Sequence, residues 1–328
     1  MKKTVCIGSV TTDILVSPVD VLPPSGVLKG VDNTSAIVGG CAANSAIDMA
    51  KMGIPSKLIC KIGNDAFGDF VKSSVEKSGM DTDGLIVDDS VSTTTSVVCI
   101  SSTGERTFLY NPGSTAIFKA EEIDLDYIDD CDTVFISGTN LLISFDGAPC
   151  AAFLKKMQAK GKFTVMDTAW DFEDIWLPKV EASLEHLDLF MPSVEEAEKI
   201  TGCTDLDEMA DFFFERGTKS VIIKTGRKGA YVCETPESRY SVSPYLVENP
   251  VDTTGAGDSF CAGFLSGLAM GWDYKRSAQL GNAAGAHCVM AVGGTTGMKP
   301  VNELIEFMGE TSRQLRKDGQ KYDKGSLS

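Results

Sequence analysis

The stretch Asp252-Thr253-Thr254-Gly255-Ala256-Gly257-Asp258-Ser259-Phe260 decides how this 328-residue chain is interpreted. Gly255, Ala256 and Gly257 carry at most a methyl side chain, so the backbone there can approach a ligand closely. The apolar periodicity that starts at Phe260 predicts a helix. Free N–H groups at the start of that helix, and the positive end of its dipole, would face one point. The stretch therefore predicts an anion hole, suited to the charge that develops on a transferred phosphoryl group.

Asp258 follows this expected anion hole directly and is the residue that we expect to act as a base. The helix end should keep its carboxylate ionised, so that it can accept a hydroxyl proton as a nucleophile attacks. The alternative is an aspartate in the first turn that only stabilises the helix dipole. The close backbone approach permitted by residues 255–257 favours the catalytic interpretation.

Outward from this stretch, short β-branched runs alternate with amphipathic helical patterns, as in βαβ units. We expect strands at 4–7, 56–61, 133–137, 163–167, 187–191 and 221–225. We expect helices at 42–52, 67–78, 148–160, 194–200 and 206–216. Several of these end at a glycine, as helix C-caps do. The predicted fold class is α/β, with a doubly wound, mostly parallel sheet flanked by helices.

Two segments break this alternation. Segment 14–38 is rich in Pro, Gly and Val, and segment 92–118 predicts a hairpin around Thr103-Gly104-Glu105. We expect both to form a small β-strand lid on one domain spanning residues 1–310; two edge strands are the alternative. A last helix is expected at 301–308, followed by a frayed polar tail at 311–328.

Composition limits the function classes. With 30 Lys and Arg against 46 Asp and Glu, the net charge is −16, so attraction to nucleic acid or to an anionic membrane is not expected. No run approaches the roughly 20 apolar residues that cross a bilayer. The first residues predict a strand rather than a signal peptide, because Gly8, Ser9 and the polar residues after them interrupt the apolar run.

The ten cysteines show no C-x-x-C spacing, and neither His186 nor His287 has a second His or Cys at ligand spacing, so a zinc site is not expected. A reduced, cytoplasmic protein fits best. A serine hydrolase is disfavoured because the chain lacks a G-x-S-x-G elbow. A dinucleotide-dependent dehydrogenase is disfavoured because Gly8-Ser9-Val10-Thr11-Thr12-Asp13 is not a G-x-G-x-x-G turn.

The stretch 252–260 resembles D-T-x-G-A-G-D-x-F, the C-terminal signature of the ribokinase-like (PfkB) carbohydrate kinases, at every position. A second family signature, a diglycine followed by a small-residue helix with Asn, is similar to Gly39-Gly40-Cys41-Ala42-Ala43-Asn44. The resemblance spans about residues 4–305. It implies a doubly wound sheet with a β lid, and phosphorylation of an alcohol on a sugar-like molecule with ATP and Mg²⁺.

The resemblance also implies a substrate site. Asp13 would accept hydrogen bonds from sugar hydroxyls, with Asn44 as its partner. Gly39 and Gly40 would form a hinge where the lid meets the body. The alternatives are a turn or cap aspartate at 13 and an ordinary strand-to-helix turn at the diglycine.

For the nucleotide, the resemblance implies contacts in the run 221–230. Thr225, Gly226 and Gly229 would lie beside ATP, although a plain hairpin is the alternative. Asn282, in a helix expected at 277–292, resembles a position that lines the adenine pocket. Its alternative is an exposed helical asparagine.

Cation sites are implied in the same way. Glu196 would organise Mg²⁺ indirectly, although Ser193 stands where the family usually has Asn, and Ser193 with Glu196 also forms a capping-box pattern. Asp252 and Thr254 match positions that hold K⁺ in relatives. The alternative is that Asp252 only caps its turn.

Departures from the family bear on the substrate. The stretch Asp167-Thr168-Ala169-Trp170-Asp171 lacks the Asn and Arg of the D-x-N-x-R segment common in relatives acting on keto-sugar acids, so an acidic sugar is disfavoured. Arg106 is the only Arg before Arg216, which leaves few bidentate partners for a sugar phosphate. Lys29 and Arg106 could still bind one phosphate. We expect a neutral sugar or polyol, phosphorylated on a primary hydroxyl.

Three alternatives stay open. A nucleoside kinase could stack a base on Phe108, Tyr110, Phe118 or Trp170, although such aromatics are usually core residues. A sugar or nucleotide sensor without catalysis could keep the fold, but the intact Asp258 argues against it. Exposed lid edges could also pair with a second copy, which predicts a homodimer.

Overall fold

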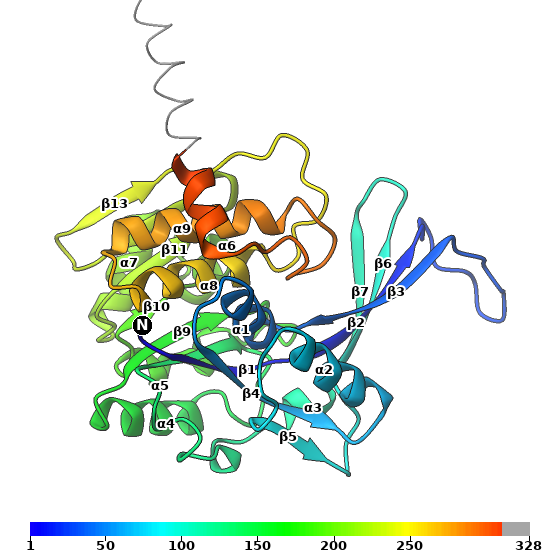
Figure 1. The fold of residues 1–328 in the computed structure, drawn as a ribbon, viewed down its shortest axis with the longest axis horizontal. Coiled ribbons are helices and arrows are strands. Elements are labelled where there is room, and N and C mark those ends of the chain that lie inside the picture. The colour runs from blue at the N-terminus through cyan, green and yellow to red at the C-terminus, as the bar shows by residue number, and fades with distance from the viewer. Residues whose placement is uncertain (310–328) are drawn as a thin grey trace, which may run out of the picture.

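The structure, a computed structural model that describes residues 1–309, contains a large and a small β-sheet (Figure 1). The large sheet has nine strands in the order β13-β12-β11-β10-β9-β8-β1-β4-β5. They are β1 (Thr4–Gly8), β4 (Ser56–Gly63), β5 (Leu85–Asp88), β8 (Thr133–Thr139), β9 (Phe163–Thr168), β10 (Leu189–Phe190), β11 (Val221–Lys224), β12 (Ala230–Cys233) and β13 (Arg239–Val242). Neighbours are parallel from β11 to β5, and β12 and β13 are antiparallel. The predicted mostly parallel α/β sheet is confirmed.

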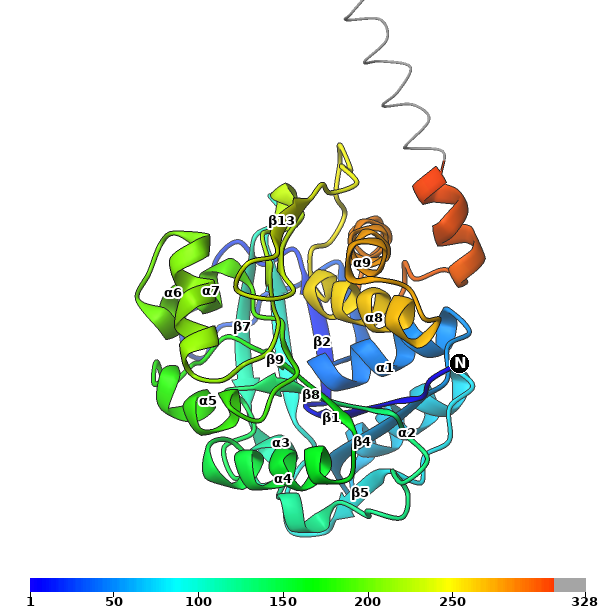
Figure 2. The ribbon, with the colours of Figure 1, turned by 90° about the vertical axis from the view of Figure 1, so that its left-hand side faces the viewer.

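Helices cover both faces of this sheet, as Figure 2 shows. On one face lie α1 (Cys41–Lys51), α2 (Ala66–Lys77), α8 (Ala256–Ala269) and α9 (Tyr274–Cys288). On the other lie α4 (Ala148–Ala159), α5 (Leu177–Leu184), α6 (Val194–Thr201) and α7 (Leu206–Glu215). Side chains alternate between the two faces along β1, so Cys6 joins the first core while Val5 and Ile7 join the second. Both cores exclude water, which explains why the central strands are apolar throughout.

The small sheet extends from the body beside α2 (Figure 1). It has the order β3-β2-β6-β7, formed by β2 (Thr11–Ser17), β3 (Asn33–Gly39), β6 (Thr95–Ile100) and β7 (Arg106–Asn111). The expected hairpin is present, because β6 and β7 pair antiparallel. The register sets Asp13 opposite Ser96 and Ser96 opposite Tyr110, so these three side chains share one face of the sheet.

The small sheet differs in extent from the two segments expected for it. It starts at Thr11, before residue 14, so Asp13 lies inside a strand. It ends at Asn111, because the chain then enters the short helix α3 (Gly113–Ala116) and Phe118 is fully buried in the body. Phe118 is buried in the core of the large sheet, so residues 113–118 pack against the body and not against the small sheet.

The strands expected in the large sheet and most of the expected helices begin and end within two residues of the observed elements. α8 begins at Ala256, before the expected Phe260, and β5, β13 and α5 were not predicted. α9 begins at Tyr274, because the Asp273 carboxylate accepts a hydrogen bond from the Arg276 N–H as an N-cap, and it ends at Cys288 before a Gly-rich turn.

The last expected helix is present, since residues 301–308 are helical, whereas the expected polar tail at 311–328 lies outside the described residues. Within residues 1–309 no helix combines the length and the apolar character that a bilayer crossing requires.

Candidate active site

The predicted base Asp258 lies where the N-termini of α1 and α8 meet. Asn44 Nδ2 donates a hydrogen bond to Asp258 Oδ2 at 2.8 Å. The Ser45 hydroxyl donates to the Asp258 carbonyl at 3.1 Å, and the Ser259 hydroxyl donates to the buried Asp48 carboxylate at 2.5 Å. Three side-chain contacts thus fix the first turn of α8 against α1, across more than 200 residues of sequence.

This arrangement gives Asn44 a partner other than the expected one. We expected it to act together with Asp13, but its amide nitrogen contacts Asp258. Its amide oxygen is buried and has no hydrogen-bond partner among the described residues. Asn44 is therefore placed to orient the Asp258 carboxylate.

The environment of Asp258 raises its pKa, whereas we expected the helix end to favour the ionised carboxylate. The residue keeps partial contact with solvent, but protein groups surround its carboxylate, and this burial raises its pKa above the ordinary value. The Asn44 hydrogen bond and the charge of Lys224 oppose this shift without cancelling it. A higher pKa makes the carboxylate a better proton acceptor, which is useful in a general base.

The anion-hole residues have the backbone geometry that their composition predicts. Gly255 has φ 76° and caps α8, and a Cβ on it would lie 2.5 Å from the Gly294 Cα. Only glycine fits both the left-handed conformation and this approach. α8 then starts at Ala256, so the N–H groups of its first turn have no partner inside the helix, although the Ala256 N–H donates to the Thr253 carbonyl at 3.3 Å.

Lys224 is a site residue that we did not assign from the sequence. It is the last residue of β11, and its side chain is only 10% exposed. Its Nζ lies 2.6 Å from Asp167 Oδ1, at the end of β9, and a Cβ placed on Gly257 would lie 3.4 Å from that Nζ. A buried ammonium group therefore lies directly against the anion hole.

The charges around Lys224 are strongly coupled. Burial acts to lower the pKa of Lys224, but the charges of Asp167 and Glu196 raise it well above the ordinary value. Burial raises the pKa of Asp167, against the attraction of Lys224. The Cys261 thiol also donates to Asp167 Oδ2 at 3.5 Å.

Glu196 and Ser193 form the capping box that the sequence indicates. The Ser193 N–H donates to Glu196 Oε2 at 2.8 Å, and the Glu196 N–H donates back to Ser193 Oγ at 3.3 Å. Thr168 Oγ1 also donates to Glu196 Oε2 at 2.9 Å. Burial raises the pKa of Glu196, while the charge of Lys224 opposes the shift. Glu196 therefore caps α6 and faces the charged cluster as well.

A cavity of about 270 Å³ opens beside Lys224 and the start of α8. Three predicted nucleotide contacts line it, namely Gly226, Gly229 and Asn282. Lys224, Ala256 and Gly257 line it as well. Thr225 directly precedes the turn η2 (Gly226–Lys228) but is not among the lining residues. The alternative of an exposed Asn282 is wrong, because it is 8% exposed and its Nδ2 donates to the carbonyls of Val242 and Ser243.

On the side of the small sheet, Asp13 is buried and accepts a hydrogen bond from Thr11 Oγ1 at 2.7 Å. Burial raises its pKa. A Cβ on Gly39 would lie 2.2 Å from Asp13 Oδ2, so glycine there leaves room for the carboxylate. Gly40 has φ 91° and precedes α1. The diglycine thus joins strand β3 to the helix that carries Asn44.

Tyr110 lies on the same face of the small sheet as Asp13, and its buried hydroxyl has no hydrogen-bond partner among residues 1–309. Burial raises the pKa of the Tyr110 hydroxyl, and the nearby Asp13 carboxylate adds to the shift. Its ring centroid lies 5.8 Å from that of Phe172.

Of the aromatic residues considered for base stacking, Phe118 is excluded because it is fully buried and stacks on Phe145. Phe108 and Trp170 are both more than half exposed.

The two cations considered for a phosphate make separate contacts. Lys29 Nζ donates to the Val21 carbonyl at 3.1 Å, within the β2–β3 loop. The Arg106 guanidinium contacts the side chains of Asp252 and Thr254. These last two are the residues that we expected to hold K⁺. Among residues 1–309, no group of three or more His, Cys, Asp and Glu could hold a metal ion.

Comparison with known proteins adds independent information. The model of the pfkB family of carbohydrate kinases matches residues 1–301. The 2-dehydro-3-deoxygluconokinase of Bacillus subtilis is 27% identical over 90% of this chain and 93% of its own length. The 5-dehydro-2-deoxygluconokinase of Geobacillus kaustophilus is 30% identical over 83% of this chain and 84% of its own. Among solved structures, the ribokinase of Thermotoga maritima has a TM-score of 0.81 at 25% identity, covering 94% of this chain and 99% of that one.

Proposed function

We propose that this chain, which belongs to the pfkB family of carbohydrate kinases, transfers the γ-phosphoryl group of ATP to a primary hydroxyl of a neutral sugar or polyol. One observation carries the proposal: Asp258, held by Asn44 at the start of α8, lies beside the Lys224 ammonium and the first N–H groups of the helix, of which Ala256 donates to the Thr253 carbonyl at 3.3 Å. A base, an anion hole and a buried cation at one point are the parts that phosphoryl transfer requires.

In this mechanism Asp258 accepts the proton of the attacking hydroxyl. The N–H groups at residues 255–257 and the Lys224 ammonium stabilise negative charge on the phosphoryl oxygens as the bond to the leaving ADP breaks. The nucleotide would bind in the cavity lined by Gly226, Gly229 and Asn282. Asp13 and Asn44, with the diglycine between them, would hold the sugar.

The charges of the site fit a nucleotide that arrives with Mg²⁺. Asp167, Glu196 and Asp258 surround a single cation, Lys224, so the cluster carries more negative than positive groups. Mg²⁺ would neutralise part of the phosphate charge. Glu196 would contribute indirectly, because its Oε2 already accepts hydrogen bonds from Thr168 and Ser193.

Two substrate classes compete. The relatives named as deoxygluconokinases favour a keto-sugar acid. The missing Asn and Arg in 167–171, and the engagement of Arg106 by Asp252, favour a neutral sugar, because a carboxylate is best bound by an unengaged arginine. We adopt the neutral sugar.

A substrate panel tests the proposal. Neutral sugars, polyols, nucleosides, sugar phosphates and deoxy keto-sugar acids are offered with ATP and Mg²⁺, and ADP release is followed with a check of product mass. Asp258→Asn is the matched control. Phosphorylation of a neutral sugar supports the proposal, and preference for an acid, a sugar phosphate or a nucleoside replaces its substrate class. If none of these compounds is phosphorylated, the alternative of a sensor without catalysis is favoured.

Two further expectations stay proposals. All ten cysteines are free thiols, which supports a reducing compartment such as the cytoplasm. The small sheet and its β2–β3 loop expose Leu28, Phe108 and Leu109, which supports a homodimer formed through the small sheet. Light scattering that gives the mass of a monomer at working concentration would contradict the dimer.

A further inference from the structure

The small sheet makes a charged contact with the loop that leads into the anion hole. Arg106 is the first residue of β7, and its Nη1 contacts both Asp252 Oδ1 and Thr254 Oγ1. Thr254 directly precedes Gly255, the residue that caps α8. A side chain of the small sheet thus contacts the loop that leads into the proposed anion hole at the start of α8.

Asp252 is a buried anion that depends on this contact. Its side chain is only 1% exposed. It also accepts hydrogen bonds from two backbone groups, Thr254 N at 2.7 Å and Gly293 N at 2.8 Å. Among the described residues, Arg106 is the one cation paired with it. Burial of an unpaired carboxylate is strongly unfavourable, so the guanidinium compensates a charge that water cannot reach.

The small sheet also contacts the surroundings of Asp252 through Ile37. A Cβ on Gly293 would lie 2.9 Å from Cδ1 of Ile37, a residue of the opposite edge strand β3. Gly293 is also the residue whose N–H binds Asp252. Both edge strands of the small sheet therefore contact the Asp252 environment, one by charge and one by packing.

We infer that Arg106 is a positioning residue that supplies the cation for the Asp252–Thr254 loop and thereby couples the position of the small sheet to the shape of the anion hole. The inference rests on the proposed function for its catalytic consequence. The guanidinium binds side chains of the same two residues that we expected to hold K⁺. An enzyme with this built-in cation needs no monovalent ion at that place.

The first experiment measures the loop without substrate, by hydrogen–deuterium exchange of a peptide covering 250–259. Arg106→Gln removes the charge, Arg106→Lys keeps it, and Arg276→Gln on α9 is the matched control, since Arg276 is exposed and lies over the Trp272 ring. We expect faster exchange in Arg106→Gln, partial recovery in Arg106→Lys, and no change in Arg276→Gln. Unchanged exchange in a folded Arg106→Gln protein would overturn the inference.

The second experiment uses turnover and chemical rescue. In tetramethylammonium buffer at constant ionic strength, we expect added K⁺ to change the kcat of the wild-type enzyme less than twofold. Arg106→Ala should lose roughly tenfold or more in kcat, with a smaller change in the KM for ATP, and millimolar methylguanidinium should restore part of kcat.

The outcomes separate the two hypotheses. A wild-type enzyme that requires K⁺, or an Arg106→Ala variant that methylguanidinium cannot rescue, contradicts the role of Arg106 and leaves the kinase proposal intact. A protein that phosphorylates nothing contradicts the kinase proposal, and the exchange experiment then still decides whether Arg106 orders the loop. If Arg106→Gln does not fold, Arg106→Lys gives the exchange test.

Discussion

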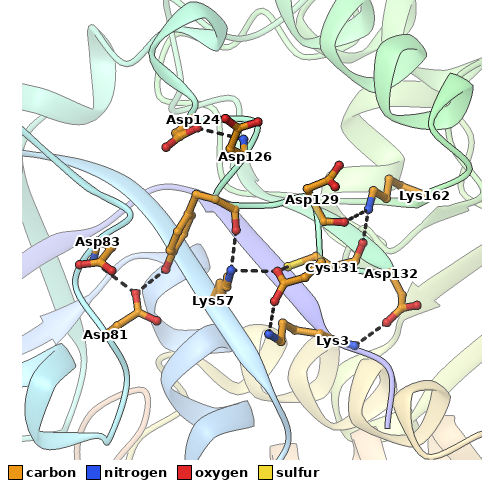
Figure 3. A network of polar contacts seen from close by, with 12 residues as sticks. Lys3, Lys57, Asp81, Asp83, Asp124, Asp126, Asp129, Cys131, Asp132 and Lys162 are labelled. Atoms are coloured by element: carbon orange, nitrogen blue, oxygen red, sulfur yellow. Dashed lines mark hydrogen bonds and ion pairs between the residues drawn. The ribbon is translucent and has the colours of Figure 1, made fainter.

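Lysines and aspartates gather at both ends of the large sheet, in two very different environments. Figure 3 shows the network at the amino ends of β1, β4 and β8, which includes Lys3 and Lys57. Both lysines pair with Asp130. The Asp130 side chain is 53% exposed. At the carboxyl ends of β9 and β11, Lys224 pairs with Asp167, whose side chain is 1% exposed.

The carboxyl groups of the two regions respond in opposite directions. The hydrogen bonds from Lys3 and Lys57 lower the pKa of Asp130. The carboxylate stays in contact with solvent, so burial does little to oppose this shift. Burial raises the pKa of Asp167 and Asp258, even though Lys224 is close to both. Exposed pairs of the first kind contribute little to stability, and buried pairs of the second kind carry a desolvation penalty. Groups with strongly shifted pKa values are common at functional sites, which agrees with the function proposed for the second region.

The largest effect is expected from Lys224→Met, which leaves Asp167 buried without its cation. Removal of one partner of a buried pair destabilises a protein by about 3–5 kcal/mol, so we expect a matching loss in the free energy of unfolding in urea. The double variant Lys224→Met with Asp167→Leu should recover much of that stability but not activity. A single variant as stable as the wild type would contradict the contrast between the two regions.

Asp258→Asn should lower turnover by roughly 100-fold or more while the affinity for ATP stays nearly unchanged, because the amide keeps the size of the side chain but cannot accept the proton. Steady-state kinetics with the substrate identified by the panel measure both quantities. Asp130→Asn makes the same chemical change at the other end of the sheet and should leave turnover unchanged. Near-normal turnover of Asp258→Asn would remove the base assignment.

Asp13→Ala should raise the KM for the sugar by roughly 10- to 100-fold, because a hydrogen bond between a charged group and a hydroxyl contributes about 1.5–3 kcal/mol. The KM for ATP should change little. Circular dichroism confirms folding. An unchanged sugar KM would move the sugar site away from the small sheet.

The pH dependence of kcat should show the raised pKa of Asp258. The base must be deprotonated, so kcat falls as the pH falls through its pKa, and the acid limb should lie above 3.8, the ordinary value for aspartate. Asp130, whose pKa is lowered, affects stability and not kcat: its pairing stabilises the fold above pH 3.8, and this contribution is lost as the pH falls toward the lowered value. An acid limb below pH 3.8 would contradict the burial of the base.

The smallest effect is expected from Asp130→Asn. Exposed ion pairs contribute about 0–1 kcal/mol, and salt screens them. Urea unfolding at low and high salt should therefore show a small loss that diminishes as salt is added. A loss as large as that of Lys224→Met would show that exposure does not separate the two regions.

The same distinction explains what the sequence could predict. Alternating runs predicted the sheet, and small residues before an apolar periodicity predicted a helix next to Asp258, because these are local patterns. α8 begins at Ala256, before the expected Phe260, because Gly255 takes a left-handed conformation as the N-cap. Lys224 was missed because one lysine at the end of an apolar strand is locally indistinguishable from an exposed strand end. The Asn44–Asp258 and Arg106–Asp252 contacts join residues far apart in the chain, and only packing brings them together.

The buried hydroxyl of Tyr110 has a consequence for how the protein would tell one sugar from another. A polar atom without a partner favours any ligand that completes its hydrogen bond, and an analogue lacking the matching group leaves it unsatisfied. Discrimination of this kind is asymmetric: an analogue that lacks the hydroxyl is rejected far more strongly than one that carries an extra methyl group. Deoxy analogues that lack the matching hydroxyl should therefore be poorer competitors than C-methylated analogues that keep it, whatever the parent sugar is.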